Sequence, residues 1–204
     1  MSKTRNPDRL ILFTDAVVAI ALTLLILPLV EVVAEYKTEH HTALEVITDH
    51  KPEIYSFLLT FVVIGNFWLG HHQVFEHVRA YTNGMMRLNL LWLLFIVVLP
   101  FPTEIVGSFE SSQFTAGFYS GTILALSASQ TALTWMIKGH AEIENPDDPV
   151  SSRELKNSFV LTGLTALAFI LAAFVPGVRF YALLLLLLSP LVMRGTDLLR
   201  NRAS

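Results

Sequence analysis

The sequence predicts an all-α integral membrane protein with six transmembrane helices per subunit. Hydrophobic residues make up 53% of the 204 residues, charged residues only 15%, and the mean hydropathy is +0.55. Soluble domains contain about 25% charged residues, so lipid must cover much of this surface in place of water. Six apolar stretches approach the roughly 20 residues that a helix needs to cross a bilayer. We place these spans in a single transmembrane domain, 1–204, at 10–30, 52–72, 88–106, 114–137, 158–175 and 178–193.

The distribution of basic residues predicts how the chain is oriented. With six spans, eleven of the fourteen Lys and Arg residues fall on the side that holds both termini, and only Lys37, Lys51 and Arg179 fall on the other. The positive-inside rule therefore places both termini in the cytoplasm. The outer side is acidic, which either raises the local cation concentration or only reflects solvated loop charges. The chain has no cysteine, so disulfides and thiolate metal sites do not contribute.

The first span keeps a carboxylate, Asp15, inside an apolar helix. An acidic side chain is costly in a bilayer and is normally retained for an interior network or a conduction path. At about 100° per residue, Ile20, Thr23, Leu24 and Leu27 fall on one face roughly 100° wide, and Asp15 lies well off it. We interpret the span as the wall of an ion pore. Ordinary helix packing is the alternative for the aliphatic face, and a structural network is the alternative for Asp15.

Prolines and polar runs divide the rest of the chain. Pro28 predicts a kink in the first span, and residues 42–48 have the weak amphipathic pattern of a short surface helix. Pro100 and Pro102 predict the end of the regular part of the third span. In the fourth span, small residues favour close helix packing, with a polar conduit as the alternative. The sixth span has no polar stripe, and we expect it to face lipid.

The second span ends in the adjacent histidines His71 and His72. We expect them at the depth of Thr14 and Asp15, where they would serve as partners for these residues. A metal site is the alternative, but the His-Glu-x-x-His spacing of zinc proteases and its inverted form are both absent. Histidine also makes the protein a candidate for sensitivity to pH.

Two runs carry a resemblance to a known family. The first is Arg9-x-x-x-Phe13-Thr14-Asp15, followed in register by Ala19-Ile20 and Thr23-Leu24-Leu25; it resembles the signature of the transmembrane protein 175 potassium channels. The second is Trp68-x-x-His71-His72-x-x-Phe75, which resembles their second helix. That family usually has serine where this chain has Thr14. Six spans in about two hundred residues are similar to its bacterial, single-repeat members.

The resemblance implies a homotetramer of six-helix subunits, in a prokaryotic plasma membrane, whose first helices line a central pore selective for potassium. By position, Ile20, Leu24 and Leu27 would form hydrophobic constriction rings, and Thr23 would place hydroxyls beside the narrowest ring. The polar network that fixes the pore helix would comprise Arg9, Phe13, Thr14, Asp15, Trp68, His71 and His72. The partners implied are lipid and the permeant potassium ion, with no other cofactor or metal and no nucleic acid.

Three other functions compete with a channel. A proton- or cation-coupled transporter would use Asp15 with His71 or His72 as a relay. An intramembrane enzyme is disfavoured, because the hydroxyl and histidine candidates lack a Gly-x-Ser-x-Gly elbow or a paired-aspartate arrangement. A structural membrane scaffold would show no ion flux at all.

Overall fold

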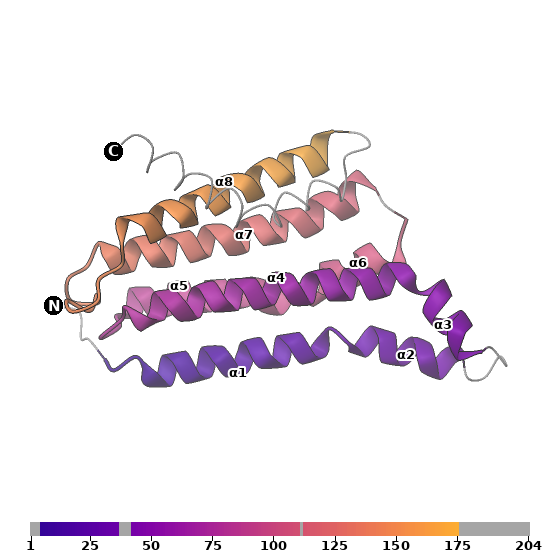
Figure 1. Cartoon of the computed structure of the whole chain (residues 1–204), viewed down its shortest axis with the longest axis horizontal. Helices are drawn as coiled ribbons and strands as arrows, with labels where there is room; N and C mark the ends of the chain where they lie inside the picture. Colours follow the sequence, from indigo (N-terminus) through magenta and orange to yellow (C-terminus); the bar gives the residue numbers. More distant parts are fainter. Residues whose placement is uncertain (1–4, 37–41, 111, 176–204) are drawn as a thin grey trace, which may run out of the picture.

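The computed structural model describes residues 5–36, 42–110 and 112–175, and every regular element in these ranges is an α-helix (Figure 1). The predicted sixth span, 178–193, lies outside the described residues. The helices follow one another along the chain as α1 Asp8–Leu24, α2 Leu27–Tyr36, α3 Ala43–Asp49, α4 Lys51–Glu76, α5 Asn83–Val98, α6 Pro100–Ser108, α7 Gln113–Lys138 and α8 Ser152–Phe174.

The long helices run side by side as an elongated bundle. α7 pairs with α8 on one side, α4 lies with α5 and α6 in the middle, and α1 with α2 forms the opposite side (Figure 1). α1 contacts α5 and α4, and α5 contacts α7. The core therefore lies between α4, α5 and α7, where side chains such as Trp92, Ile64 and Leu126 are fully buried.

Two of the predicted spans are interrupted helices. The first breaks after Leu24 and resumes at Leu27, so the kink expected from Pro28 is present. The third breaks at Leu99, so the regular helix α5 ends just before Pro100 as the sequence predicted, and a second helix, α6, runs on from Pro100 to Ser108. The prolines occupy the first turn of α6, where a backbone N–H has no intrahelical acceptor and its loss costs nothing.

Four helical stretches are long and apolar enough to cross a membrane by length and composition: Asp8–Val33, Lys51–Glu76, Asn83–Ser108 and Ser152–Phe174. They correspond to the first, second, third and fifth predicted spans. The predicted fourth span, 114–137, is a single helix of similar length, α7, yet it is not among these candidates. Its buried face contains several Ser and Thr residues, which lower its hydropathy.

Four of the helices, α3, α5, α7 and α8, begin at residues with capping side chains. Ser112 and Ser151 each accept from a backbone N–H three residues later and complete a capping box at the starts of α7 and α8. Thr82 caps α5 in the simpler way. Thr42 forms a capping box with Glu45, so the short amphipathic helix predicted at 42–48 is confirmed as α3.

At the end of the bundle that holds the start of α1, three connecting segments pair through their backbones. Arg5 and Tyr81 exchange two hydrogen bonds of 3.1 and 2.9 Å, and Val78 forms a bridge with Glu144. The segment between α4 and α5 is thus tied both to the residues that precede α1 and to the connection between α7 and α8.

Candidate functional site

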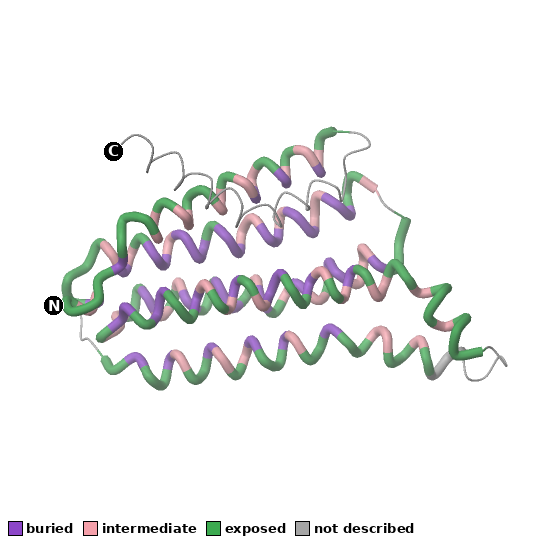
Figure 2. Tube along the Cα trace, viewed as in Figure 1, coloured by how far each residue is buried: buried purple, intermediate pink, exposed green. Residues whose placement is uncertain are grey.

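The two sides of α1 have different environments. Leu10, Thr14, Val18, Ala21 and Leu25 recur every three or four residues and are buried against the bundle. The side of α1 that faces away from α4 and α5 is mostly exposed (Figure 2). One face of this helix is therefore fixed to its own subunit, while the other has no cover from the described residues.

The aliphatic face predicted from periodicity is the exposed face. Ile20 is 58% exposed, Leu24 43% and Leu27 48%, and Thr23 is exposed between them. The Thr23 hydroxyl donates to the Ile20 carbonyl oxygen at 2.8 Å. Since its proton is used within the helix, the lone pairs of the Thr23 oxygen remain available on the exposed side.

Asp15 is fixed to α4 by a hydrogen bond between side chains. The indole Nε1 of Trp68 donates to Asp15 Oδ1 at 2.9 Å, and the Trp68 ring lies 5.7 Å from the His72 ring. Asp15 is half-buried on a side of α1 different from the aliphatic face. The structure therefore places this carboxylate in a contact between helices, away from the exposed Ile20 side.

Thr14 is fixed to α5 and α4 by a directed chain of hydrogen bonds. His71 Nε2 lies 2.7 Å from Asn89 Oδ1, the Asn89 amide donates to Thr14 Oγ1 at 2.8 Å, and Thr14 donates to the Leu10 carbonyl at 2.8 Å. The Asn89 oxygen is only an acceptor, so His71 carries its proton on Nε2. The three side chains are almost fully buried. These bonds thus join α4, α5 and α1, and the chain of bonds ends on the α1 backbone.

Aromatic rings hold His71 in place from both sides. Its ring stacks on Phe75 at 4.1 Å and on Trp92 at 4.2 Å between centroids. Asn89 and Trp92 both lie on α5 and were not among the predicted site residues. A lone asparagine in the apolar run that contains Trp92 was the signal that could have identified Asn89, since polar residues inside membrane helices are seldom incidental.

The other members of the predicted network lie elsewhere. Arg9 and Phe13 are exposed, and at about 100° per residue they fall near Ile20 on the uncovered face of α1. His72 is exposed on α4, and its Nε2 lies 3.8 Å from Glu76, one turn along the helix. The structure therefore brings together Thr14, Asp15, Trp68 and His71, and it does not bring Arg9, Phe13 or the polar edge of His72 into that group.

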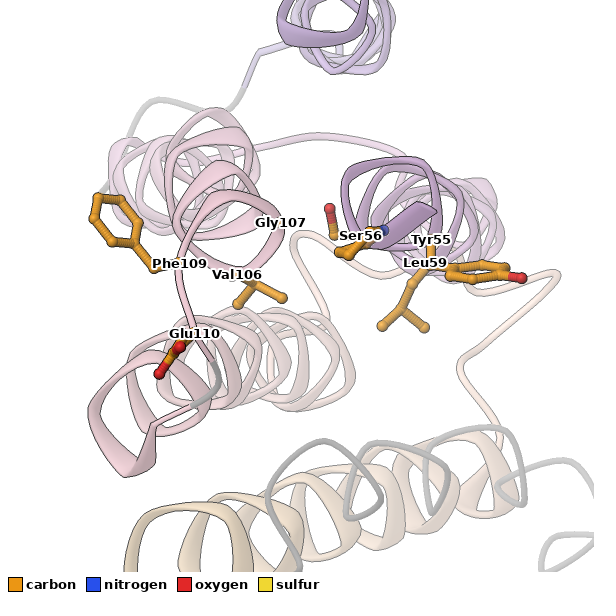
Figure 3. Close-up of a pocket in the computed structure, with 8 residues that line it drawn as sticks. Tyr55, Ser56, Leu59, Val106, Gly107, Phe109 and Glu110 are labelled. Carbon is orange, nitrogen blue, oxygen red and sulfur yellow. The ribbon is translucent and has the colours of Figure 1, made fainter. Parts of the chain in front are cut away.

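One cavity lies apart from these residues. It has a volume of about 570 Å³ and lies between α4 and α6, with Tyr55, Leu59, Val106 and Phe109 among its lining residues (Figure 3). No predicted pore or network residue lines it. Over the described ranges, no group of three or more His, Asp or Glu side chains is arranged to hold a metal ion.

Comparisons with known proteins show which proteins this chain is similar to. Residues 9–100 match the family described as endosomal/lysosomal potassium channel TMEM175. A protein of Streptomyces collinus named as a potassium channel is 31% identical over 157 residues, which are 74% of this chain and 75% of that protein. A chicken protein named endosomal/lysosomal proton channel TMEM175 is 33% identical over 118 residues, 55% of this chain and 24% of that protein.

A solved structure is similar over most of the chain. The crystal structure of a lysosomal potassium-selective channel TMEM175 homolog from Chamaesiphon minutus matches with a TM-score of 0.66 at 25% identity. The match covers 89% of this chain and 96% of that one. The chain therefore belongs to the TMEM175 family of ion channels, and it is a multi-pass membrane protein and not an enzyme, as the sequence predicted.

Proposed function

We propose that the chain is a potassium-selective cation channel whose pore is lined by the exposed face of α1, contributed by four copies of the chain. The observation that carries the proposal is the contrast between the two opposite faces of α1. The buried face is fixed by Thr14 and Asp15, and the opposite face presents an aliphatic row that includes Ile20 and Leu24. Relatives named as potassium channels support the choice of ion.

More than one copy of the chain is needed, and the resemblance to the bacterial, single-repeat members of the family implies four. One α1 cannot enclose a pore, so copies of the chain must meet around a shared axis, and closed rotational symmetry is the usual solution. In such a ring Ile20, Leu24 and Leu27 from each copy would face the axis and form stacked hydrophobic constrictions. The Thr23 oxygen would lie between these constrictions as a ligand for a partly dehydrated cation.

Such a throat selects ions by dehydration. A narrow apolar ring closes by dewetting, and when open it removes part of the hydration shell of an ion without replacing it. Potassium holds its water less tightly than sodium, so a ring that offers few ligands favours potassium. The buried network then acts by holding α1 at a fixed distance from the axis.

We place the protein in a prokaryotic plasma membrane with both termini in the cytoplasm, in agreement with the excess of Lys and Arg on that side. A transporter with Asp15 and His71 as a relay is disfavoured, because these two side chains share no hydrogen bond among the described contacts and bond to Trp68 and Asn89. No cofactor is required for conduction.

The test is the flux of potassium and of sodium into liposomes that contain the purified protein. Ile20→Ala widens the proposed ring and should raise the flux of both ions while lowering the potassium preference. The matched control is Leu94→Ala, which removes a similar number of atoms from a 53% exposed position on α5. If Ile20→Ala and Leu94→Ala both conduct and select as the wild type does, the ring assignment is wrong.

A further inference from the structure

His77 lies at the end of α4, outside the membrane-spanning helices, between two acidic partners from distant parts of the chain. Its Nδ1 is 2.9 Å from the Asp148 carbonyl oxygen and 3.1 Å from Asp148 Oδ2. Its Nε2 is 3.2 Å from Glu154 Oε1, in the first turn of α8. The His77 side chain is only 11% exposed. Both ring nitrogens are therefore held against oxygen atoms.

This geometry selects the doubly protonated ring. A neutral imidazole carries one N–H, so its second nitrogen would direct a lone pair at an oxygen that also carries lone pairs. Burial lowers the pKa of His77, but the bonds to Asp148 and Glu154 outweigh burial and hold the pKa above its ordinary value of 6.5. The positive form of His77 is thus the one that the surrounding oxygens accommodate.

Other charged groups nearby are engaged with different partners. Lys138, at the end of α7, donates to the Val150 carbonyl and to Ser152. Glu144 accepts from the Val150 N–H, and Glu76 on α4 lies beside His72. The charged groups that face the His77 ring are therefore Asp148 from the connection between α7 and α8, and Glu154 from α8.

The backbone around His77 connects this cluster to the start of α1. The His77 carbonyl accepts from Asn145 N–H at 2.7 Å, and Arg79 N–H donates to the Ile143 carbonyl at 3.0 Å. Two residues further, Tyr81 exchanges two backbone bonds with Arg5, three residues before α1 begins. We call segment 77–81, with its pairing to 143–145 on one side and to Arg5 on the other, the clamp.

We propose that His77 is a proton sensor that controls the clamp, and through it the start of the pore helix. When His77 is protonated, Asp148 and Glu154 hold the connection between α7 and α8 against the end of α4. When His77 loses its proton, one ring nitrogen faces an oxygen without a hydrogen between them, and the connection is released. The effect on conduction rests on the proposed channel function, whereas the release of the clamp does not.

The sign follows from the direction of the shift. The pKa of His77 is higher when the clamp is formed, so protonation and clamp formation favour each other. The stabilisation is fully present below about pH 6.5, the pKa of a free histidine, and is lost as the pH rises through the higher pKa of the clamped state. Each unit between these two pKa values corresponds to about a tenfold change in the equilibrium between clamped and released forms.

The test is hydrogen exchange of the full-length protein in lipid nanodiscs at pH 6 and pH 8, corrected for the intrinsic pH dependence of exchange. In the wild type we expect peptides covering 77–81 and 140–148 to lose several-fold protection at pH 8, because local opening exposes their amides. His77→Gln cannot be charged and should show low protection at both pH values. His140→Gln is the control, since His140 lies exposed in the same connection and its ring Nδ1 bonds to the Met136 carbonyl, in the last turn of α7.

A second variant keeps the test valid if His77→Gln perturbs folding. Glu154→Gln preserves an oxygen acceptor for the capping box of α8 but removes one charge from His77, so the clamp should open at a lower pH than in the wild type. Protection in α4 and α7 shows whether each variant is folded. The proposal is overturned if exchange protection in the wild type does not depend on pH. It is also overturned if folded His77→Gln shows the same pH dependence as the wild type.

Potassium flux at the same two pH values then tests the link to the pore. We expect flux to depend on pH in the wild type and in His140→Gln, and not in His77→Gln. If no form conducts, the proposed function is wrong, but the exchange data still test whether the clamp opens with pH. If all forms conduct with the same pH dependence, the sensor is not coupled to the pore and that part of the proposal is wrong.

Discussion

The helices α1 and α7 differ in a way that reverses the rule for soluble proteins. α7 is rich in hydroxyl side chains and is the most buried helix, with Ser120, Thr134 and several others inside the bundle. The first span, Asp8–Val33, is the most apolar of the four candidate membrane stretches, yet only 17% of its most apolar window is buried. The polar helix lies inside and the apolar helix lies outside.

The difference arises because buried polar side chains need hydrogen-bond partners, whereas apolar side chains need only apolar surroundings. Buried hydroxyls on α7 donate to carbonyls of the same helix, as Ser120 does to Ala116, or bond to Thr162 on α8. These bonds leave few polar atoms unpaired and allow the two helices to approach closely. α1 needs no such compensation, because lipid or neighbouring copies of the chain would cover its apolar outer face.

The largest expected effect is on the free energy of unfolding, and it compares a buried leucine on α7 with an exposed leucine on α1. Leu133 on α7 is fully buried and Leu12 on α1 is 69% exposed. Leu133→Ala leaves a cavity and should lower the free energy of unfolding by about 2–5 kcal/mol, whereas Leu12→Ala should change it by less than about 0.5 kcal/mol. Thermal and denaturant unfolding in detergent would measure both. Equal losses would show that the outer face of α1 is closely packed, within the subunit or against another copy of the chain.

The next effect tests the attachment of α1. Asn89→Ala leaves the His71 N–H without its acceptor and removes the donor to Thr14 Oγ1, which should cost about 1–3 kcal/mol for each atom left unsatisfied. The control Asn66→Ala removes the same amide from an exposed position on α4. If Asn89→Ala unfolds in detergent no more easily than Asn66→Ala, the hydrogen bonds of Asn89 do not stabilise the attachment of α1.

A smaller effect is expected where α7 meets α8. The Thr162 hydroxyl lies 3.0 Å from Ser127 Oγ and 2.8 Å from Thr131 Oγ1. Thr162→Val keeps the shape and removes these bonds, and hydrogen bonds between membrane helices contribute about 0.6 kcal/mol on average. A loss of unfolding free energy far above that value would mean that the α7–α8 contact depends on its hydroxyl groups more than on close packing.

The sequence predicted the apolar elements better than the polar contacts. Hydropathy identified the first, second, third and fifth spans, and Pro28 predicted the break between α1 and α2, because both signals are local. Pro100 and Pro102 likewise predicted the end of α5, but the sequence did not predict that a second helix begins at Pro100, although a proline pair can start a helix as well as stop one. The predicted tetramer and the roles of the pore residues stay predictions.

The polar contacts were harder to predict because their members are far apart in the chain. Asn89 meets Thr14 across 75 positions, and His77 meets Glu154 across 77. Periodicity placed Ile20 and Leu24 on one face of a helix, but it does not tell whether that face is covered. The structure supplies that information for the subunit, where both side chains are exposed.

The most direct test of the central claim is the reactivity of single cysteines on α1, since the chain contains none of its own. Leu24→Cys and Leu27→Cys should react with a charged, membrane-impermeant thiol reagent in liposomes, and the reaction should block potassium flux. Leu94→Cys, exposed on α5, should not react. If Leu24→Cys and Leu27→Cys are inert, or react without any change in flux, then this face of α1 does not line the pore.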